Sequence, residues 1–480
     1  MKSLLQELIR HELVDVVGEE HVIVDASARE DFATDYSWAA KYLRLRDLPM
    51  PAPNVVVRPS SHDEVVKIVR IASTHRLPIV AKGGGSGTQG GVLALYGGIG
   101  LDLRRMNRIL EIDEVSLCVT AEAGIAGTAL EEAVSARGLT LAHYPGSMLL
   151  DPTLGGFLAA RGSGVVSTKY GKAEDIVMAL RAAVPPGKTF RTHPVPNHAT
   201  GPSLLGAFVG SEGTLGVITE ATMRLDPLPE ARRFLGFAFD DVFAGLRAGR
   251  DVMAARWRPA AMRLYDDAGT RDLASVLGLD VQGSLMVIMC DGDARLADLE
   301  AEAIAAICTR RGARELGETA GRTWWDGRYK VYKAGVAPEP PLLFGTTDTV
   351  CRFKDIEALY RAKKETIERG FARYAARYTA HFSHWYPWGT MVYDRFYVDQ
   401  PPQEPREAIA LHESIWDAAV RVNLRYGGTV NEHHGIGVKL GRFVREQYGE
   451  EAFSVVQDVK DAIDPAGIMN PGKLGFGPPR

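Results

Sequence analysis

The sequence predicts an α+β protein with a ligand-binding domain in its first half, an α+β domain behind it and a helical C-terminal segment. Three observations indicate this organisation. Short strands and helices alternate from residue 54, glycine-rich segments interrupt that alternation three times, and the second half mixes long helices with isolated strands. Alternating elements are typical of an α/β unit, and a mixed order is typical of an α+β domain.

The length of 480 residues is sufficient for two to three domains with large cores. We expect a helical segment and linker over residues 1–53, a ligand-binding domain over 54–227, a second domain over 228–402 and a helical segment over 403–480. The first boundary follows Pro49-Met50-Pro51-Ala52-Pro53, a stiff composition that suits a linker.

The composition is typical of a soluble globular chain, with 46% hydrophobic and 24% charged residues. The net charge of −4 argues against a nucleic-acid-binding protein. Because the N-terminus lacks a signal-peptide pattern and no apolar run reaches about 18 residues, we expect a cytoplasmic protein. Four scattered cysteines form no CxxC pair and are expected as free thiols: Cys118, Cys290, Cys308 and Cys351.

The N-terminal residues 1–22 predict one amphipathic helix, and a loop rich in aromatic and basic residues follows over 36–46. Three interpretations of this loop stay open: contact with a membrane surface, a cover over a ligand site, or an ordinary loop between domains.

In the first domain, residues 55–57 predict a strand and residues 60–74 a helix with Ser60 or Ser61 as its N-cap. A strand over 77–81 leads directly into the first glycine-rich segment. The other elements expected here are strands at 100–102, 109–113, 117–121 and 216–225 and a helix at 128–137.

In the second half, the helix expected over 404–426 contains no glycine and is stopped by Gly427-Gly428. The other expected helices cover about 240–255, 293–311 and 354–372, and the expected strands cover 284–290, 343–350 and 391–398.

The three glycine-rich segments are residues 83–91, 153–156 and 210–218. Glycine lacks a Cβ atom and tolerates positive φ, so bare backbone can approach a ligand closely. Successive N–H groups in such loops form concave anion sites. Three segments suggest one long ligand wrapped by several loops, and a dinucleotide is the natural candidate.

Residues 85–90 formally fit the GxGxxG pattern, but the Rossmann interpretation also requires a helix to begin in the loop. The many glycines over residues 91–100 disfavour a helix there. A purely structural turn would not need so long a glycine run. Backbone contact with a ligand therefore explains the segment best.

Together these segments resemble the FAD-binding domain of the vanillyl-alcohol oxidase / p-cresol methylhydroxylase (PCMH-type) superfamily over residues 54–226. The resemblance implies a two-lobed domain that binds extended FAD, with the pyrophosphate on the first glycine-rich segment and the isoalloxazine facing a substrate (cap) domain. The cofactor-binding residues that it implies are Gly83, Gly84, Gly85, Ser86, Gly87, Thr88, Pro145, Gly146, Ser147, Thr153, Gly155, Gly156, Ser163, Gly164, Tyr170, Glu212, Gly213, Gly216 and Ile218.

Some members of this superfamily attach FAD through a histidine or cysteine in these loops. Because the first loop here contains neither residue, the resemblance implies a non-covalent FAD. His143, just before the second segment, is the one position that leaves covalent attachment open.

The strongest catalytic signal is the turn Asn431-Glu432-His433-His434-Gly435-Ile436-Gly437. Imidazole takes up or releases a proton near neutral pH, so paired histidines beside a carboxylate suit acid–base chemistry. A structural or surface histidine pair is the alternative on sequence alone. A flavin domain in the same chain favours the catalytic interpretation.

Two further positions in the second half support this interpretation. Arg263 lies in an apolar stretch and suits bidentate binding of a carboxylate or phosphate, with an ion pair to Asp266 or Asp267 as the alternative. Tyr393 lies in an aromatic, strand-like stretch and is a candidate hydrogen-bond donor to the substrate, or simply a core tyrosine.

Within the superfamily, these segments most resemble the alkyldihydroxyacetone-phosphate synthase group. The resemblance implies that Arg263, Tyr393, His433 and His434 form an active site that the C-terminal segment completes. The implied reaction holds a phosphate-bearing substrate at flavin N5 and replaces its acyl chain with a long-chain alcohol, without net redox change. Arg263 would hold the phosphate, and Tyr393 and the histidines would handle protons.

The chain departs from that group's pattern at two places. Glu432 stands where the first of three histidines is expected. No second arginine directly precedes the expected strand at 343–350, and the nearest preceding cations are Arg328, Lys330 and Lys333. A lost phosphate ligand and a gained carboxylate fit a different substrate.

The alternative is the D-lactate/glycolate group of 2-hydroxy-acid dehydrogenases in the same superfamily. Its signature is a Glu-His-Gly turn and a pair of metal-binding histidines seven residues apart. Here the turn has one extra residue, and Met391 stands seven residues after His384. A metal held by His384, Glu432 and His433 is therefore a minor alternative, and no metal is predicted. In this interpretation Arg263 holds the carboxylate while hydride passes to flavin N5.

A third interpretation is a non-catalytic flavin-binding subunit, against which Arg263, Tyr393 and the histidine pair count. The partner we expect is a small-molecule or lipid-like substrate with a carboxylate or phosphate, and not a nucleic acid. Peripheral membrane contact and a homodimer stay open.

Overall fold

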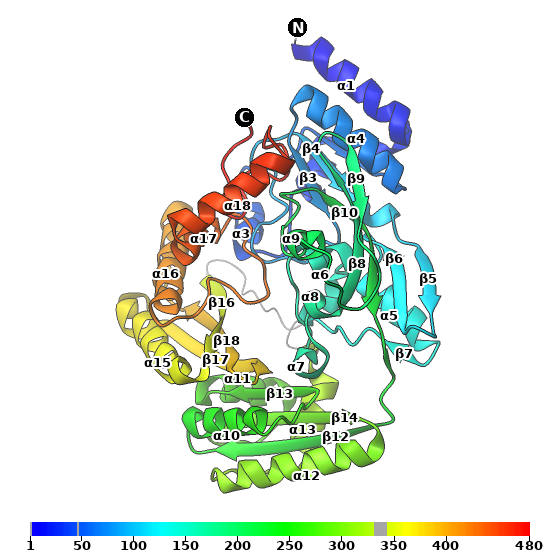
Figure 1. Cartoon of the computed structure of the whole chain (residues 1–480). Helices are drawn as coiled ribbons and strands as arrows, with labels where there is room; N and C mark the ends of the chain where they lie inside the picture. Colours follow the sequence, from blue (N-terminus) through cyan, green and yellow to red (C-terminus); the bar gives the residue numbers. More distant parts are fainter. Residues whose placement is uncertain (1, 46–47, 331–342) are drawn as a thin grey trace.

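The computed structural model describes residues 2–45, 48–330 and 343–480. Figure 1 shows two lobes of sheet and helix in the first half, a large sheet across the far end of the molecule, and C-terminal helices that lead back to the first lobe. The mixed α and β architecture confirms the predicted fold class.

The first lobe is built on a four-stranded sheet in the order β1-β2-β4-β3, in which β2 and β3 run parallel to β4. Its strands are β1 (Val22–Ile23), β2 (Val55–Val57), β3 (Ile79–Lys82) and β4 (Ile99–Asp102). Its helices are α1 (Lys2–Val17), η1 (Glu19–His21), α2 (Ala26–Phe32), α3 (Trp38–Leu45) and α4 (His62–His75).

The second lobe is an antiparallel sheet in the order β5-β6-β10-β8-β9. Its strands are β5 (Ile109–Asp113), β6 (Cys118–Glu122), β8 (Val177–Val184), β9 (Lys188–Arg191) and β10 (Val217–Arg224). The helices and turns that join the two lobes and cover this sheet are η2 (Leu103–Arg105), α5 (Gly127–Ser135), η3 (Gly146–Leu150), α6 (Leu154–Ala159), α7 (Ser167–Tyr170), α8 (Ala173–Ile176) and α9 (Leu204–Phe208). A short ladder of β7 (Leu139–Thr140) and β11 (Asp226–Pro227) leads into the second half.

The second half contains a seven-stranded antiparallel sheet in the order β15-β12-β14-β13-β17-β18-β16. Its strands are β12 (Ala231–Phe239), β13 (Ala261–Tyr265), β14 (Ser284–Gly292), β15 (Arg314–Glu315), β16 (Leu343–Arg352), β17 (Ala376–Tyr386) and β18 (Gly389–Val398). Its helices are α10 (Val242–Ala254), α11 (Asp267–Leu277), α12 (Ala294–Arg310), α13 (Gly317–Gly327), α15 (Phe353–Gly370) and η4 (Ala372–Tyr374).

The C-terminal helices are α16 (Pro405–Arg425), α17 (Gly441–Tyr448) and α18 (Glu450–Ile463). After α18 the chain returns to the first lobe, where Met469 forms a parallel bridge with Ile79 of β3. Ile468 and Met469 are buried in the same hydrophobic core as Ile79. The tail therefore packs beside the strand that leads into the first glycine-rich segment.

Helix α4 shows why the local sequence predictions work where apolar spacing and capping agree. Ser61 is its N-cap, and the Ser61 hydroxyl accepts a hydrogen bond from the Glu64 N–H. The buried residues Val65, Ile68, Val69 and Ala72 recur at helical spacing. The predicted helix over 60–74 and the neighbouring strands are confirmed.

The prediction of a loop over residues 36–46 is wrong for its larger part, because Trp38–Leu45 is helix α3. Trp38 and Tyr42 are buried in the core of the second half, and the Trp38 ring stacks on His412 with the centroids 4.0 Å apart. Packing of these aromatic rings stabilises a helix that the local sequence does not signal. The two aromatic side chains are therefore not available to a membrane surface. Arg46 lies outside the described residues, as does Lys333.

The first glycine-rich segment leads into an irregular stretch, and the structure has no helix between β3 and β4. This geometry is not that of a Rossmann turn, as the sequence predicts. Across the described part of the chain, no helix is both long enough and apolar enough to cross a lipid bilayer.

Candidate active site

The three glycine-rich segments, β13, β16, β17, β18, α16 and the turn after α16 surround one cavity of about 320 Å³, here called the central cavity. The structure brings all predicted catalytic residues to it: Arg263, Tyr393, His433 and His434. It also brings there all but one of the predicted cofactor-binding residues: Gly83, Gly84, Gly85, Ser86, Gly87, Thr88, Pro145, Gly146, Ser147, Thr153, Gly155, Gly156, Ser163, Gly164, Glu212, Gly213, Gly216 and Ile218.

Close packing explains why glycine is required where the first two segments meet. A Cβ atom on Gly83 would lie 1.9 Å from Thr153 Oγ1, and one on Gly84 would lie 2.0 Å from the Asp151 carbonyl oxygen. Gly85 has φ of +72°, which disfavours any other residue. The loop after β3 therefore presents bare backbone to the cavity.

The residues around the central cavity fit FAD. The Ser163 hydroxyl and the Gln89 side-chain carbonyl are buried and have no hydrogen-bond partner among the described residues, and both residues line the cavity. Buried polar atoms of this kind normally have a partner, and the ribityl and phosphate oxygens or ring nitrogens of a flavin dinucleotide supply such partners.

Tyr170 is the predicted cofactor-binding residue that does not line the central cavity. It is buried, and its hydroxyl donates a hydrogen bond to Asp291 Oδ1 at 2.9 Å, so it joins α7 to the second half. His143 is also buried and lies outside the cavity lining, with its ring against Phe157.

Glu212 joins the third glycine-rich segment to the catalytic turn. Its carboxylate accepts hydrogen bonds from the backbone N–H groups of Ile436 and Gly437, the latter at 2.7 Å. Burial raises the pKa of Glu212, and the two N–H donors oppose this rise. The residue therefore lines the cavity and also fixes the position of the turn that carries His433 and His434.

Strand register places three site residues in one row on the seven-stranded sheet. Tyr393 of β18 lies directly opposite Asp348 of β16 on one side and His381 of β17 on the other. Residues opposite one another in an antiparallel ladder point to the same face. The rings of His381 and Tyr393 are stacked with centroids 4.8 Å apart, and the His434 ring lies 5.3 Å from the Tyr393 ring.

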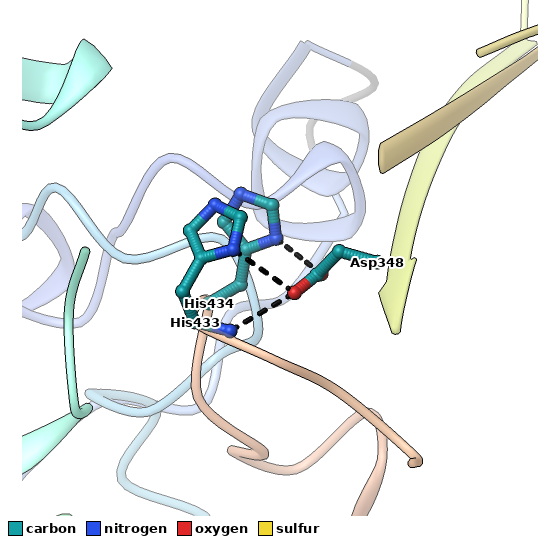
Figure 2. Close-up of side chains that lie close together, drawn as sticks. All are labelled: Asp348, His433 and His434. Atoms are coloured by element: carbon teal, nitrogen blue, oxygen red, sulfur yellow. Dashed lines mark hydrogen bonds and ion pairs between the residues drawn. The ribbon is translucent and has the colours of Figure 1, made fainter. Parts of the chain in front are cut away.

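Asp348 is the fully buried acceptor that organises the catalytic turn, as Figure 2 shows. Its Oδ1 accepts from His434 Nδ1 at 2.5 Å, and its Oδ2 accepts from the His433 N–H at 2.9 Å and lies 3.2 Å from His433 Nδ1. Asn431 Nδ2 and the Glu432 N–H also donate to this carboxylate. Asp348 therefore fixes both imidazole rings and the backbone between them.

The surroundings of the turn shift the pKa values of His433 and His434 in opposite directions. Burial lowers the pKa of His434, and the nearby Asp348 carboxylate only partly opposes this. Burial also acts on His433, but the Asp348 and Glu432 carboxylates outweigh it and raise the pKa of His433 to about 9. Burial opposes ionisation of Asp348, yet the two imidazoles hold its pKa well below the ordinary value. At neutral pH the turn thus presents a neutral His434 beside a cationic His433.

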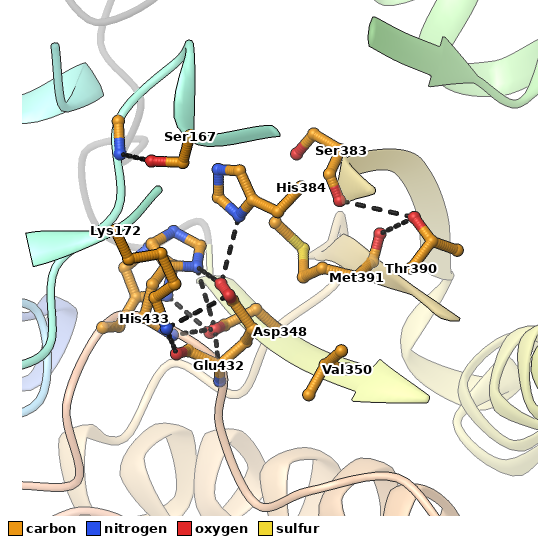
Figure 3. A network of polar contacts seen from close by, with 12 residues as sticks. Ser167, Lys172, Asp348, Val350, Ser383, His384, Thr390, Met391, Glu432 and His433 are labelled. Carbon is orange, nitrogen blue, oxygen red and sulfur yellow. Dashed lines mark hydrogen bonds and ion pairs between the residues drawn. The ribbon is translucent and has the colours of Figure 1, made fainter. Parts of the chain in front are cut away.

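Glu432 is the centre of a second buried network, shown in Figure 3. Its Oε2 accepts from His433 Nδ1 at 2.8 Å and from His384 Nδ1 at 3.1 Å. Its Oε1 accepts from the Tyr386 hydroxyl at 2.9 Å and lies 3.2 Å from Lys172 Nζ. Lys172 also donates to the Glu432 carbonyl oxygen at 2.7 Å.

His384 reaches this network through an irregularity in β17. The β17–β18 register shifts between Ser383 and Trp385, and His384 adopts φ of 50°. A bulge of this type re-aims one side chain and is common beside active sites. The bulge brings His384 together with Glu432 and His433, the three residues of the metal alternative, with ligand atoms within 4.8 Å of one another.

Arg263 of β13 lies at the wall of the central cavity beside the row on the sheet. Its Nη1 lies 3.4 Å from His381 Nε2, and its guanidinium carbon lies 5.5 Å from the centre of the Trp324 ring. Its Nε is buried without a hydrogen-bond partner among the described residues. The alternative ion pair with Asp266 is not formed, because that carboxylate instead accepts from the Gly269 N–H and the Tyr360 hydroxyl. Asp267 likewise accepts from the Ser284 hydroxyl.

Sequence reasoning missed Asp348, His381 and Lys172. A carboxylate inside the otherwise uncharged stretch 343–351 was a usable signal for Asp348, since a buried carboxylate needs partners. Lys172 lies in the first half of the chain, 260 residues before Glu432, and nothing local connects the two.

The chain belongs to the FAD-linked oxidase family. Residues 53–193 match the model of the FAD binding domain, and residues 228–474 match that of the FAD linked oxidases, C-terminal domain. FAD is therefore the cofactor, as predicted.

Three curated relatives illustrate the range of this family. The alkyldihydroxyacetonephosphate synthase of Trypanosoma brucei brucei is 29% identical over 98% of this chain and 80% of its own length. The uncharacterized FAD-linked oxidoreductase YgcU of Escherichia coli K12 is 30% identical over 98% of this chain and 99% of its own. The glycolate oxidase subunit GlcD of Bacillus subtilis is 27% identical over 97% and 96%, respectively.

Solved structures agree with the fold. An alkyldihydroxyacetonephosphate synthase superimposes with a TM-score of 0.81 at 26% identity, covering 97% of this chain and 86% of that one. The p-cresol methylhydroxylase with substrate bound superimposes with a TM-score of 0.79 at 16% identity, covering 98% and 97%. The predicted superfamily and two-lobed FAD-binding architecture are confirmed.

Proposed function

We propose that the protein is a FAD-dependent enzyme of the alkyldihydroxyacetone-phosphate synthase type, which replaces the acyl chain of an acyl dihydroxyacetone phosphate with a long-chain alcohol. One observation carries this choice: the Lys172 ammonium lies 3.2 Å from Glu432 Oε1. With this cation and three further hydrogen-bond donors, Glu432 is a structural acceptor rather than a substrate or metal ligand. Arg263, Tyr393 and His434 are then the groups that face the substrate.

FAD, when bound, supplies an electron-poor ring system that accepts an electron pair from the substrate. In this proposal, the guanidinium of Arg263 binds the anionic end of the substrate in the central cavity. His434 takes the proton from the substrate carbon, because its Nδ1–H is held by Asp348 and Nε2 is left to act as the base. Tyr393, packed between His381 and His434, returns a proton to the substrate oxygen.

The reaction balances without an external oxidant. The bond between the substrate carbon and the acyl oxygen breaks, and the chain leaves as a fatty carboxylate. The alcohol oxygen bonds to the same carbon and loses its proton. The proton that the alcohol loses is released with the carboxylate. His434 returns to the substrate carbon the proton it took, and Tyr393 takes back the proton it lent to the substrate oxygen, so no net redox change occurs.

A 2-hydroxy-acid dehydrogenase is the second candidate, and a neutral His434 in the same cavity as Arg263 favours it. A D-2-hydroxy acid would place its carboxylate on Arg263 and its hydroxyl proton on His434. The relative named as a glycolate oxidase subunit supports this candidate.

The visible spectrum of the anaerobic holoenzyme tests both candidates. We expect acyl dihydroxyacetone phosphate to bleach the flavin and a fatty alcohol alone to restore the colour. The His434→Ala variant should bind FAD and fail to bleach, whereas the exposed control His193→Ala should behave as the wild type. Bleaching by a D-2-hydroxy acid that only an electron acceptor reverses would overturn the synthase proposal in favour of the dehydrogenase.

A further inference from the structure

A second cavity of about 450 Å³ adjoins the central cavity. The two cavities share Val165, Arg263, His381 and Tyr393 as lining residues. These side chains line both cavities, so a group bound by Arg263 lies next to the second cavity.

The strands that carry Tyr393 and His381 also carry residues that line this second cavity. Tyr393 and Arg395 alternate along β18, and His381 and Arg377 lie four residues apart on β17. Alternate residues of a strand point to the same face, and each pair of residues advances about 7 Å. Arg377 and Arg395 thus lie on the face that carries the catalytic tyrosine, farther along the sheet.

Five arginines from four elements and the turn after α13 line this space, which we call the arginine cavity: Arg263, Arg271, Arg328, Arg377 and Arg395. Among the described lining residues, Asp272 is the one carboxylate. Arg377 is also paired with Asp399, at 2.6 Å between Nε and Oδ2. Arginines still outnumber these two carboxylates, so the cavity attracts anions.

Aromatic rings hold most of these guanidinium groups in place. The distances from guanidinium carbon to ring centroid are 5.5 Å for Arg263 over Trp324, 3.9 Å for Arg328 over Trp325, 5.0 Å for Arg377 over Tyr397 and 5.6 Å for Arg395 over Tyr393. Stacking on a ring orients a guanidinium, and Arg377 and Arg328 are held further by hydrogen bonds to Asp399 and to the Trp325 carbonyl oxygen. Guanidinium groups oriented in this way are suited to a tetrahedral oxyanion.

We propose that the arginine cavity binds the phosphate group of the substrate, with Arg271, Arg377 and Arg395 joining Arg263 as its ligands. This inference rests on the proposed function for the identity of the substrate. It also supplies the second phosphate ligand that the sequence lacks before β16, because Arg395 lies directly opposite Thr346 of that strand.

Calorimetric titration of the FAD-loaded protein with inorganic phosphate tests the site without turnover. We expect saturable binding that Arg271→Gln and Arg395→Gln each weaken by about tenfold. Arg271→Lys should recover part of the affinity. Arg369→Gln, which removes an exposed arginine from α15, should leave binding unchanged. Absorbance of the bound flavin and the far-ultraviolet spectrum show that each variant is folded.

Competition separates the possible sources of the phosphate. Dihydroxyacetone phosphate should displace inorganic phosphate from the arginine cavity. If it does not, the cavity binds free phosphate and not the phosphate group of the substrate. Absence of phosphate binding, or equal binding by the wild type and both glutamine variants, would overturn the site itself. If phosphate binds as expected but acyl dihydroxyacetone phosphate does not bleach the flavin, the site stands and the proposed function fails.

Discussion

Asp348 fixes more groups of the candidate site than either histidine does. Its buried carboxylate accepts from both imidazoles and from the backbone between them. We expect Asp348→Asn to keep the shape of the residue but to lose the charge that fixes the His434 tautomer. The rate of flavin bleaching should fall by about 100-fold or more. Stopped-flow absorbance measures this rate, and the bound flavin content serves as control. A variant that keeps full FAD content and the wild-type rate would contradict this role.

The pKa of His433 predicts how stability depends on pH. The folded value of about 9 lies above the ordinary 6.5, so the charge attraction is complete below pH 6.5 and is lost as the pH rises through about 9. The loss should be on the order of 3 kcal/mol in the free energy of unfolding.

Urea denaturation at several pH values measures this dependence, with His433→Gln as the comparison. The difference in unfolding free energy between wild type and variant should shrink between pH 6.5 and 9. Lysines that titrate in the same range are common to both proteins and cancel in the difference. A difference that stays constant over this range would contradict the raised pKa.

The third glycine-rich segment and the catalytic turn are joined through Glu212, which accepts from two consecutive N–H groups. In Glu212→Gln one acceptor oxygen becomes an amide donor that faces a backbone N–H. We expect a loss of roughly 1.5–3 kcal/mol in unfolding free energy and slower flavin bleaching. Glu230→Gln, at an exposed position of the same region, is the matched control and should change neither quantity.

Two substitutions in the first glycine-rich segment distinguish the role of its glycines in loop packing from their role in FAD binding. A Cβ atom on Gly84 would clash with the Asp151 carbonyl oxygen, so Gly84→Ala should destabilise the apoprotein and weaken FAD binding. The nearest protein atom to a Cβ on Gly87 is 4.0 Å away, so Gly87→Ala should weaken FAD binding alone. Thermal unfolding of apoprotein and fluorescence titration with FAD measure the two effects. Equal apoprotein melting temperatures for both variants would contradict this distinction.

Local sequence predicts a helix or strand correctly where its apolar spacing agrees with its packing. It fails where contacts with distant segments determine the secondary structure. Helix α16 follows from its apolar spacing and the glycines behind it. Strand β8, with the sequence VMALRAAV, has no alternation and suits a helix equally well. It is a strand because β10 and β9 pair with it on both sides. Helix α3 forms for a similar reason, through Trp38 packing on His412.

The residues of the candidate site likewise fall into those that local sequence predicts and those that only distant contacts bring together. The glycine-rich segments and the histidine turn are contiguous motifs, so their residues could be predicted with their cavity. Lys172, His381 and the arginine cavity come from separate elements, and only the order of strands in the sheet brings them together. Asp348 was visible in the sequence as an acidic residue in an otherwise uncharged stretch, but its partners were not.

At the level of the complete chain, the C-terminal tail closes the FAD-binding lobe. Lys460 Nζ pairs with Asp464 Oδ2 at 2.5 Å and donates to the carbonyl oxygens of Thr214 and Met469. Removal of residues 465–480 should lower the melting temperature by about 5 °C or more and weaken FAD binding, although the tail lies far from the first lobe in sequence. Differential scanning fluorimetry measures the shift. Arg480→Ala, which removes only an exposed ion pair, should leave both unchanged.

The bonds of Glu212 to the catalytic turn have a consequence for regulation of the holoenzyme. One residue lines the flavin cavity and holds the turn, so ordering of the turn and retention of FAD are coupled free energies. Such coupling is reciprocal: whatever factor FAD contributes to the order of the turn, a substrate that orders the turn contributes to the affinity for FAD. Substrate should therefore slow the dissociation of the flavin, and an enzyme without substrate should be the form that exchanges it.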